Sequence, residues 1–205
     1  ARGRSDIAGH DLGGGVAQIA AVRAPARCAG LLLTNAVCFD AWPIPIARLL
    51  RTMGPLVERL PDAVLREMFR MFFSLAHDRR DAAAAALEIH FPPYRRQGGA
   101  AAFLHQLRSL DEDDTLAISE RLDALPMPAR VVWGAGDLFL PLRYGERLAR
   151  ALRAPLRPIE AAGHFTPEDH PAIVAAELDR LLRDVAWVAE RRDGGRRRST
   201  SANGN

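Results

Sequence analysis

The stretch Gly9-His10-Asp11-Leu12-Gly13 decides the fold of this chain. It follows a short strand-like segment at residues 5–9 and opens an apolar helical run from Val16 to Val22. A sharp turn from strand to helix forces its central residue toward positive φ, which Asp tolerates better than most residues. The flanking glycines remove side chains that would clash at such a turn. The pattern therefore predicts that the Asp11 carboxylate stands at a helix N-terminus, where the helix dipole favours its charge.

Two later segments carry polar residues in a comparable setting. Residues 131–141 have the pattern of a short buried strand that ends in a glycine loop with Asp137. Residues 161–171 have the pattern of a strand end and a glycine turn with His164, followed by a helix start. The chain order is nucleophile, acid, histidine, which is the order of α/β-hydrolases. Because the carboxyl ends of parallel strands meet at one edge of a sheet, we expect Asp11, Asp137 and His164 to converge.

At these three motifs the chain resembles the Asp-nucleophile branch of the α/β-hydrolase superfamily, the haloalkane dehalogenases and epoxide hydrolases. The resemblance covers about residues 5–185. It implies a partial α/β-hydrolase fold, in which a parallel sheet has helices on both faces and a helical cap is inserted. It also implies that Asp11 is the nucleophile, that His164 is the general base and that Asp137 orients His164.

An Asp nucleophile selects a type of reaction. A carboxylate is ionised near neutral pH and needs no base to activate it. It suits displacement at a saturated carbon, with loss of halide or opening of an epoxide, and the product is an alkyl ester on Asp11. Histidine then activates the water that hydrolyses this ester. We therefore expect a hydrolase for a small organic substrate, an epoxide or a halogenated compound, with no metal and no cofactor. Attack of Asp11 on an ester would give an anhydride, which argues against an esterase.

Each acidic residue also has a structural alternative. Asp11 could be a helix N-cap, and Asp137 could be an Asx-turn residue after Gly136. Asp40 is a rival for the acid, because it follows the strand that ends near Thr34, a position that some members of the family use.

The resemblance assigns two further residues to the site. The backbone N–H of Leu12, directly after the nucleophile, would be an oxyanion donor. Related dehalogenases commonly carry Trp or Arg at this position, so Leu12 argues against dehalogenation. Epoxide hydrolases use cap tyrosines to protonate the opening oxygen, and Tyr94 is the only tyrosine in the expected cap. An ordinary turn tyrosine is the alternative for Tyr94.

The other histidines have no spacing typical of metal ligands. We expect His10 to be a packing residue beside the nucleophile and His170 to lie at the surface or at a helix start. We expect ordinary, partly exposed histidines at the three cap positions, His77, His90 and His105.

The pattern of apolar runs divides the chain into four parts. Residues 1–42 hold the elbow strand, its helix and the next strand, residues 43–122 form a helical cap, and residues 123–189 complete the hydrolase core. Residues 190–205 should be a disordered tail. All 28 basic residues are Arg and the net charge is only +3, so the arginines of the tail indicate a solvated end and not nucleic-acid binding. Cys28 and Cys38 should be small apolar residues in or beside a strand.

The sequence predicts neither membrane insertion nor secretion, because it has no apolar run near 18 residues and no signal-peptide pattern. A reducing cytoplasm fits two free cysteines. The full fold places strands and an HG-type loop before the elbow, and no His-Gly pair occurs in this chain. We therefore expect the C-terminal two-thirds of an α/β-hydrolase that tends to form homo-oligomers. The alternative function is that of a truncated, catalytically inactive fragment or interaction module.

Overall fold

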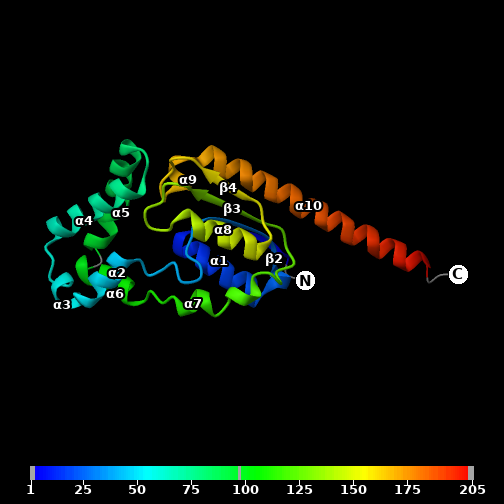
Figure 1. Cartoon of the computed structure of the whole chain (residues 1–205), viewed down its shortest axis with the longest axis horizontal. Helices are drawn as coiled ribbons and strands as arrows, with labels where there is room; N and C mark the ends of the chain where they lie inside the picture. Colours follow the sequence, from blue (N-terminus) through cyan, green and yellow to red (C-terminus); the bar gives the residue numbers. More distant parts are fainter. Residues whose placement is uncertain (1–2, 97, 203–205) are drawn as a thin grey trace.

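The computed structural model describes residues 3–96 and 98–202 (Figure 1). Four parallel strands form one sheet in the order β1-β2-β3-β4, with bounds Ser5–His10, Cys28–Ala36, Ala129–Gly134 and Leu156–Ile159. Because consecutive strands are neighbours and parallel, every connection crosses from one end of the sheet to the other. Strand β2 is buried along nearly its whole length, as its continuous apolar run predicts.

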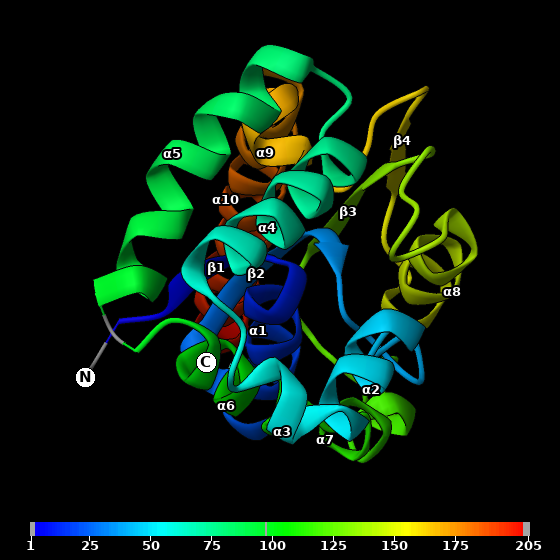
Figure 2. The same cartoon turned by 90° about the vertical axis from the view of Figure 1, so that its left-hand side faces the viewer.

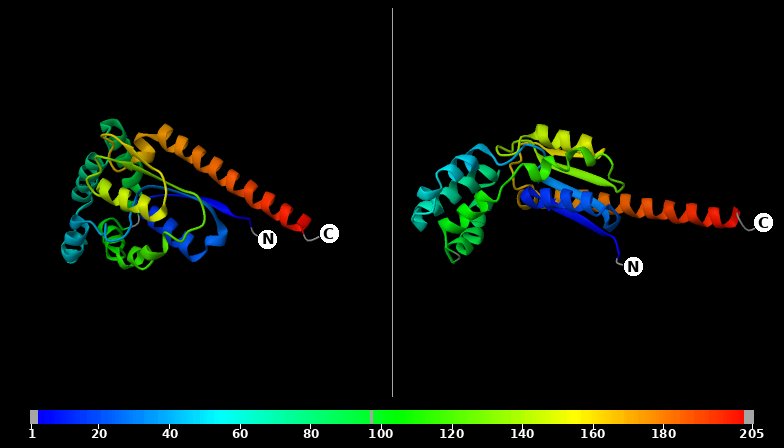
Figure 3. Two further views of the ribbon diagram at one scale, coloured as in Figure 1. Left: turned by 45° about the vertical axis from the view of Figure 1, so that its right-hand side comes forward. Right: turned by 90° about the horizontal axis from the view of Figure 1, so that it is seen from below.

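Helices cover both faces of this sheet, which confirms the predicted α/β-hydrolase fold. On one face, Leu31 and Leu33 of β2 share a core with residues of α1 (Asp11–Arg23) and α8 (Leu142–Leu152). On the other face, Leu32 packs with α10 (Pro171–Ala202). The alternation follows from strand geometry, since successive side chains point to opposite faces. Figure 3 shows α8 and α10 on opposite sides of the sheet.

The connection from β2 to β3 is helical, and we call its helices α2–α7 the cap. Their bounds are Pro45–Thr52, Gly54–Val57, Asp62–Ala76, Arg80–Arg96, Ala100–Arg108 and Asp113–Leu116. The remaining short helices of the described chain are η1 (Pro25–Arg27), η2 (Ser119–Arg121) and α9 (Thr166–Asp169). Helices α4–α6 have an apolar core of their own, centred on Phe69 and Phe73. Figures 1 and 2 show helices α2–α6 across one end of the sheet, the end at which β1 runs into α1, whereas α7 lies beside α1.

Close approach of α1 to the sheet requires glycine at two positions. A Cβ at Gly9 would lie 2.5 Å from the Gly13 carbonyl oxygen, and a Cβ at Gly14 would lie 2.3 Å from the Ala36 Cβ. A Cβ at Gly13 would meet nothing within 4 Å. The expectation that both flanking glycines prevent a clash is therefore correct for Gly9 and wrong for Gly13, because the second close contact falls one residue later.

The C-terminal segment differs from the expected disordered tail. Helix α10 continues to Ala202, and residues 203–205 lie outside the described residues. Alanine, glutamate and arginine favour helix and allow such continuation despite Gly194 and Gly195. The Arg191 guanidinium lies 4.1 Å from the centre of the Trp187 ring, a cation–π contact on this helix. Across the described residues, the structure contains no helix that is long and apolar enough to cross a membrane.

Candidate active site

The turn between β1 and α1 presents Asp11 as the first residue of the helix. Asp11 has φ 48°, the left-handed conformation that the Gly-x-Asp-x-Gly pattern predicts. Its backbone oxygen accepts a hydrogen bond from the Val37 N–H at 3.1 Å, which ties the turn to the end of β2. The N-cap alternative does not hold, because His10 occupies the N-cap position and makes no side-chain capping bond.

The loop after β3 buries Asp137 and satisfies both of its oxygens. Oδ1 accepts backbone N–H bonds from Phe139 at 2.8 Å and Leu140 at 3.0 Å, which is an Asx-type turn. Oδ2 lies 2.8 Å from His164 Nδ1 and accepts a bond from the Asn35 amide at 2.7 Å. Asp137 therefore fits both interpretations drawn from the sequence, a turn residue and the partner of the histidine.

His164 connects the two carboxyl groups. Its ring is buried, and Nε2 lies 3.6 Å from Asp11 Oδ1 on the side opposite Asp137. Because an ionised carboxylate only accepts hydrogen bonds, Nδ1 carries the proton toward Asp137 and the Nε2 lone pair faces Asp11. The structure thus brings Asp11, Asp137 and His164 together at the carboxyl ends of strands, as predicted. Their catalytic roles remain predictions.

The rival acid Asp40 does not reach the histidine. Its carboxylate is exposed and pairs with Arg147 at 3.0 Å. The sequence analysis did not identify Asn35, which is fully buried at the end of β2 and binds Asp137. The available signal was a polar pair, Thr34-Asn35, that interrupts the apolar run Cys28–Leu33 at a strand's carboxyl end.

Burial and charge shift the pKa values of the site in different directions. Burial raises the pKa of Asp11, and the nearby His164 opposes this only in part. Burial would also raise the pKa of Asp137, but the hydrogen bond and charge of His164, together with the hydrogen bonds from Leu140 and Asn35, outweigh it and the net pKa is lowered. Burial would lower the pKa of His164, but Asp137 and then Asp11 raise it above its usual value. Asp137 is therefore the permanent anion of the site.

His10 is a neutral neighbour of this group. Burial, and next the charge of His164, lower its pKa to about 4. Its Nδ1 lies 3.0 Å from the Thr34 carbonyl oxygen, and its ring centre lies 4.9 Å from that of His164. This agrees with the expected packing role beside the nucleophile.

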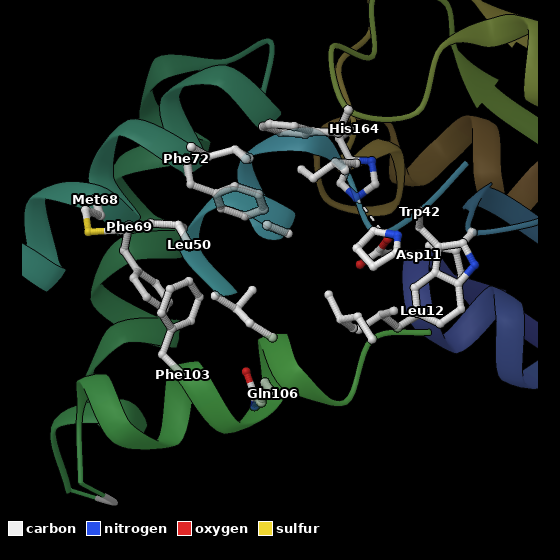
Figure 4. Close-up of a pocket in the computed structure, with 18 of the residues that line it drawn as sticks. Asp11, Leu12, Trp42, Leu50, Met68, Phe69, Phe72, Phe103, Gln106 and His164 are labelled. Atoms are coloured by element: carbon white, nitrogen blue, oxygen red, sulfur yellow. Dashed lines mark ion pairs between the residues drawn. The ribbon is translucent and has the colours of Figure 1, made fainter. Parts of the chain in front are cut away.

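A cavity of about 370 Å³ opens between Asp11 and the cap. Figure 4 shows Leu50, Phe72 and Gln106 pointing into the space that faces Asp11 and His164. The wall is almost entirely apolar, with these lining residues besides the catalytic candidates: Leu12, Val37, Trp42, Pro43, Ile44, Ile46, Ala47, Leu50, Met68, Phe69, Met71, Phe72, Leu75, Tyr94, Phe103, Gln106, Leu107, Leu110, Phe139 and Leu140. Both residues that the resemblance assigned to the site, Leu12 and Tyr94, line it.

Two polar groups of the cavity wall, the Tyr94 hydroxyl and the Trp42 indole N–H, already have hydrogen-bond partners. The Tyr94 hydroxyl donates to Gln106 Oε1 at 2.5 Å, and the Trp42 indole N–H donates to the Thr115 hydroxyl at 2.7 Å. Burial raises the pKa of Tyr94, so its hydroxyl stays protonated as a donor. The Leu12 backbone N–H is one of the groups that lower the pKa of Asp11, so this donor lies on the side of the carboxyl group.

A second histidine–carboxylate cluster joins the cap to the loop of His164. His77 was expected to be partly exposed, and this is wrong: its side chain is fully buried, with Nδ1 3.0 Å from Asp169 Oδ1. His170, at the start of α10, pairs with Asp78 at 2.6 Å. The Ala76 carbonyl oxygen accepts the backbone N–H of His164 at 2.6 Å. The sequence gives no sign of this burial, because the partners lie 92 residues apart.

The two remaining cap histidines agree better with expectation. The His90 side chain is about half exposed, 3.6 Å from Glu168, and His105 is exposed. Among the described residues, no group of three or more His, Cys, Asp or Glu side chains is arranged to hold a metal ion. Cys28 and Cys38 are buried free thiols in and just after β2.

Comparison with known proteins places this geometry in a family. Residues 1–177 match the model of the alpha/beta hydrolase family. A 2-hydroxymuconate semialdehyde hydrolase of Pseudomonas putida is 28% identical over 186 residues, which are 89% of this chain and 63% of that protein. An alpha/beta hydrolase fold protein from Burkholderia ambifaria is 27% identical with a TM-score of 0.78, covering 86% of this chain and 66% of that one.

A thermophilic esterase from Thermogutta terrifontis shares the fold, with a TM-score of 0.67 and 24% identity over 89% of this chain and 66% of that chain. The chain thus spans about two-thirds of the length of the relatives that it matches. From the family match over residues 1–177 and from the sheet, the helices and the elbow, we conclude that the chain belongs to the alpha/beta hydrolase family.

Proposed function

We propose that this hydrolase acts through a covalent alkyl ester on Asp11, formed from a small apolar epoxide or, as the second choice, a halogenated compound. One observation carries the proposal: the elbow presents a carboxylate, and the histidine nitrogen that faces it is 3.6 Å away. A carboxylate needs no base to attack carbon, so His164 is free to act on water in a later step.

The proposed reaction has two steps. An Asp11 oxygen forms a bond to a saturated carbon of the substrate, and the bond from that carbon to the epoxide oxygen or halide breaks. A halide leaves as the anion, whereas the opened epoxide oxygen takes the proton of the Tyr94 hydroxyl and leaves Tyr94 as a phenolate. His164 Nε2 then takes a proton from water, whose oxygen attacks the Asp11 carboxyl carbon. The alcohol leaves with the proton from His164, which makes Asp11 a carboxylic acid. This acid returns its proton to the Tyr94 phenolate after epoxide opening, or releases it to solvent after loss of halide, so Asp11 is again a carboxylate. The negative charge of Asp137 stabilises the protonated imidazole between these transfers.

Formation of the ester would also lower the pKa of His164 before it acts as a base. The charge of Asp11 is one of the causes that raise the pKa of His164. Alkylation removes that charge, so the pKa of His164 falls as its work as a base begins. Before the first step, the charge of His164 favours the ionised form of Asp11. Before the second step, the uncharged ester at Asp11 favours the neutral imidazole of His164.

The cavity wall favours an epoxide over a halide. An opening epoxide needs a proton, and the Tyr94 hydroxyl can donate it because its bond to Gln106 is exposed and can be exchanged, unlike the buried bond of Trp42. A leaving halide needs hydrogen-bond donors, but the Trp42 N–H is already bound to Thr115 and Leu12 carries no side-chain donor beside Asp11. An apolar substrate fits a wall with so few polar groups.

The esterase and semialdehyde hydrolase among the relatives suggest attack on a carbonyl as another reaction. In this chain such an attack by Asp11 gives an anhydride, a less stable intermediate than an alkyl ester. An aryl ester substrate that is turned over by the chain, with no alkyl ester from epoxide or haloalkane, would favour that reaction.

The test is to trap the ester. His164→Gln in the 205-residue chain keeps the nucleophile and removes the base, so styrene oxide should add its full mass to the protein. A primary alkyl chloride should instead add its mass less that of hydrogen chloride. Peptide mapping should place the adduct on Asp11, and Asp11→Asn should prevent it. The control His105→Gln, at an exposed position of α6, should accumulate no adduct if the parent turns over.

Absence of any adduct on His164→Gln, with turnover by the parent, would contradict the proposal. Absence of both adduct and turnover would support the inactive fragment.

A further inference from the structure

We propose that Asn35 is a positioning residue of this site, whose amide holds the Asp137 carboxylate in one orientation and shares its charge with His164. Asn35 is completely buried at the carboxyl end of β2, the strand between those that carry Asp11 and Asp137. The inference deepens the proposed function, because it concerns how the pair of His164 and Asp137 is tuned.

The orientation of the Asn35 amide follows from its partners. Oδ1 lies 3.1 Å from the backbone nitrogen of Gly134, which can only donate a hydrogen bond. The Thr166 hydroxyl donates to the same oxygen at 2.9 Å. The amide nitrogen must therefore point the other way, to Asp137 Oδ2 at 2.7 Å. Backbone geometry thus settles the assignment of oxygen and nitrogen that the shape of an amide leaves open.

Asn35 joins three parts of the site through one side chain. Gly134 ends β3, Asp137 lies in the loop after it, and Thr166 starts α9 two residues after His164. Asn35 also has φ 37°, a left-handed conformation that asparagine tolerates better than most residues. An isosteric apolar side chain would leave the Gly134 N–H and the Thr166 hydroxyl without this partner in a buried place.

Asp137 Oδ2 accepts two bonds, so Asn35 and His164 share one oxygen. A donor that competes for this oxygen reduces the negative charge available to the imidazolium. Three titratable groups face His164: Asp137, Asp11 at 3.6 Å and the neutral His10, whose ring centre lies 4.9 Å away. Of these three groups, Asn35 forms a hydrogen bond only to Asp137. Loss of the Asn35 amide should therefore change the pKa of His164 through Asp137.

The experiment measures the pKa of His164 directly, by NMR titration of histidine-labelled chain without substrate. His164→Gln assigns the signal by its loss. Asn35→Leu removes the amide and should raise the pKa of His164 by about 0.5–1 unit. Asn35→Ala also removes the donor to Asp137, with a side chain too small to clash, so it should raise the pKa of His164 as well.

Gln18→Leu is the matched control. Gln18 is a fully buried amide of α1 whose nitrogen donates to the Gly14 and Val37 carbonyl oxygens and not to Asp11, Asp137 or His164. It should lower the melting temperature and leave the pKa of His164 unchanged. An unchanged or lowered pKa of His164 in folded Asn35→Leu or Asn35→Ala would overturn the proposal, as would an equal rise in Gln18→Leu. This readout needs no turnover, so it fails or succeeds separately from ester trapping. Where turnover is present, the pH dependence of ester hydrolysis should move upward with the pKa of His164.

Discussion

Replacement of Asp137 by Asn separates the two proposed steps, because the structure dictates which way the new amide turns. The position of Oδ1 faces the backbone N–H groups of Phe139 and Leu140 at 2.8 and 3.0 Å, and only an oxygen can accept both. The amide nitrogen must then take the position of Oδ2, where it faces His164 Nδ1. His164 can satisfy this donor only with an unprotonated Nδ1, so its proton moves to Nε2 and the base is lost.

The expected effect is large and confined to the second step. Loss of the base in the wrong tautomer lowers the rate of ester hydrolysis by about 10³–10⁴-fold, by analogy with other triads, or about 4–5.5 kcal/mol in the barrier. Formation of the ester should change by less than about 10-fold, since Asp11 needs no base. The new amide also faces the Asn35 donor, which should lower the free energy of unfolding by about 1–3 kcal/mol.

Rapid quench followed by intact-mass measurement gives both rates. Asp137→Asn should accumulate the Asp11 ester within the first turnover, whereas Asp40→Asn should behave as the parent, because Asp40 is exposed and paired with Arg147. An equal loss in both steps, or fast hydrolysis of the ester by Asp137→Asn, would refute the tautomer argument.

Three further predictions rest on other features. The raised pKa of Asp11 means that ester formation should increase with pH through a value above that of an ordinary Asp, and the raised pKa of His164 means that ester hydrolysis should also increase with pH; single-turnover profiles check both. A profile that falls with pH in either step would contradict this assignment. Gly14→Ala should lower the free energy of unfolding by about 1–3 kcal/mol, because its Cβ would meet that of Ala36. Gly13→Ala should raise the free energy of unfolding by up to about 1 kcal/mol. Thermal melts in which Gly14→Ala is the more stable of the two variants would exclude this packing. The outer edge of β1 pairs with no described strand, so the 205-residue chain should self-associate, and a concentration-independent monomer in size-exclusion chromatography would contradict this.

The core of the fold was predictable because local patterns and long-range packing agree there. The glycines around Asp11 and the continuous apolar run of β2 both indicate buried parallel strands, and chain order alone suggests that Asp137 and His164 lie near Asp11. Asn35 and His77 were missed for one physical reason. The polar pair Thr34-Asn35 marks the end of an apolar run but names no partner, and His77 carries no mark at all; only the folded chain supplies Asp137 and Asp169, which make their burial favourable.

The bond from the His164 N–H to the Ala76 carbonyl oxygen has a consequence for how substrate enters. Ala76 ends α4, and the next two residues, His77 and Asp78, are anchored to Asp169 and His170. Because of these bonds, a movement of this corner of the cap away from the sheet would also move His164 away from Asp11 and Asp137, and the three residues would no longer be in contact. We therefore expect substrate and product to reach and leave Asp11 without movement of this corner of the cap.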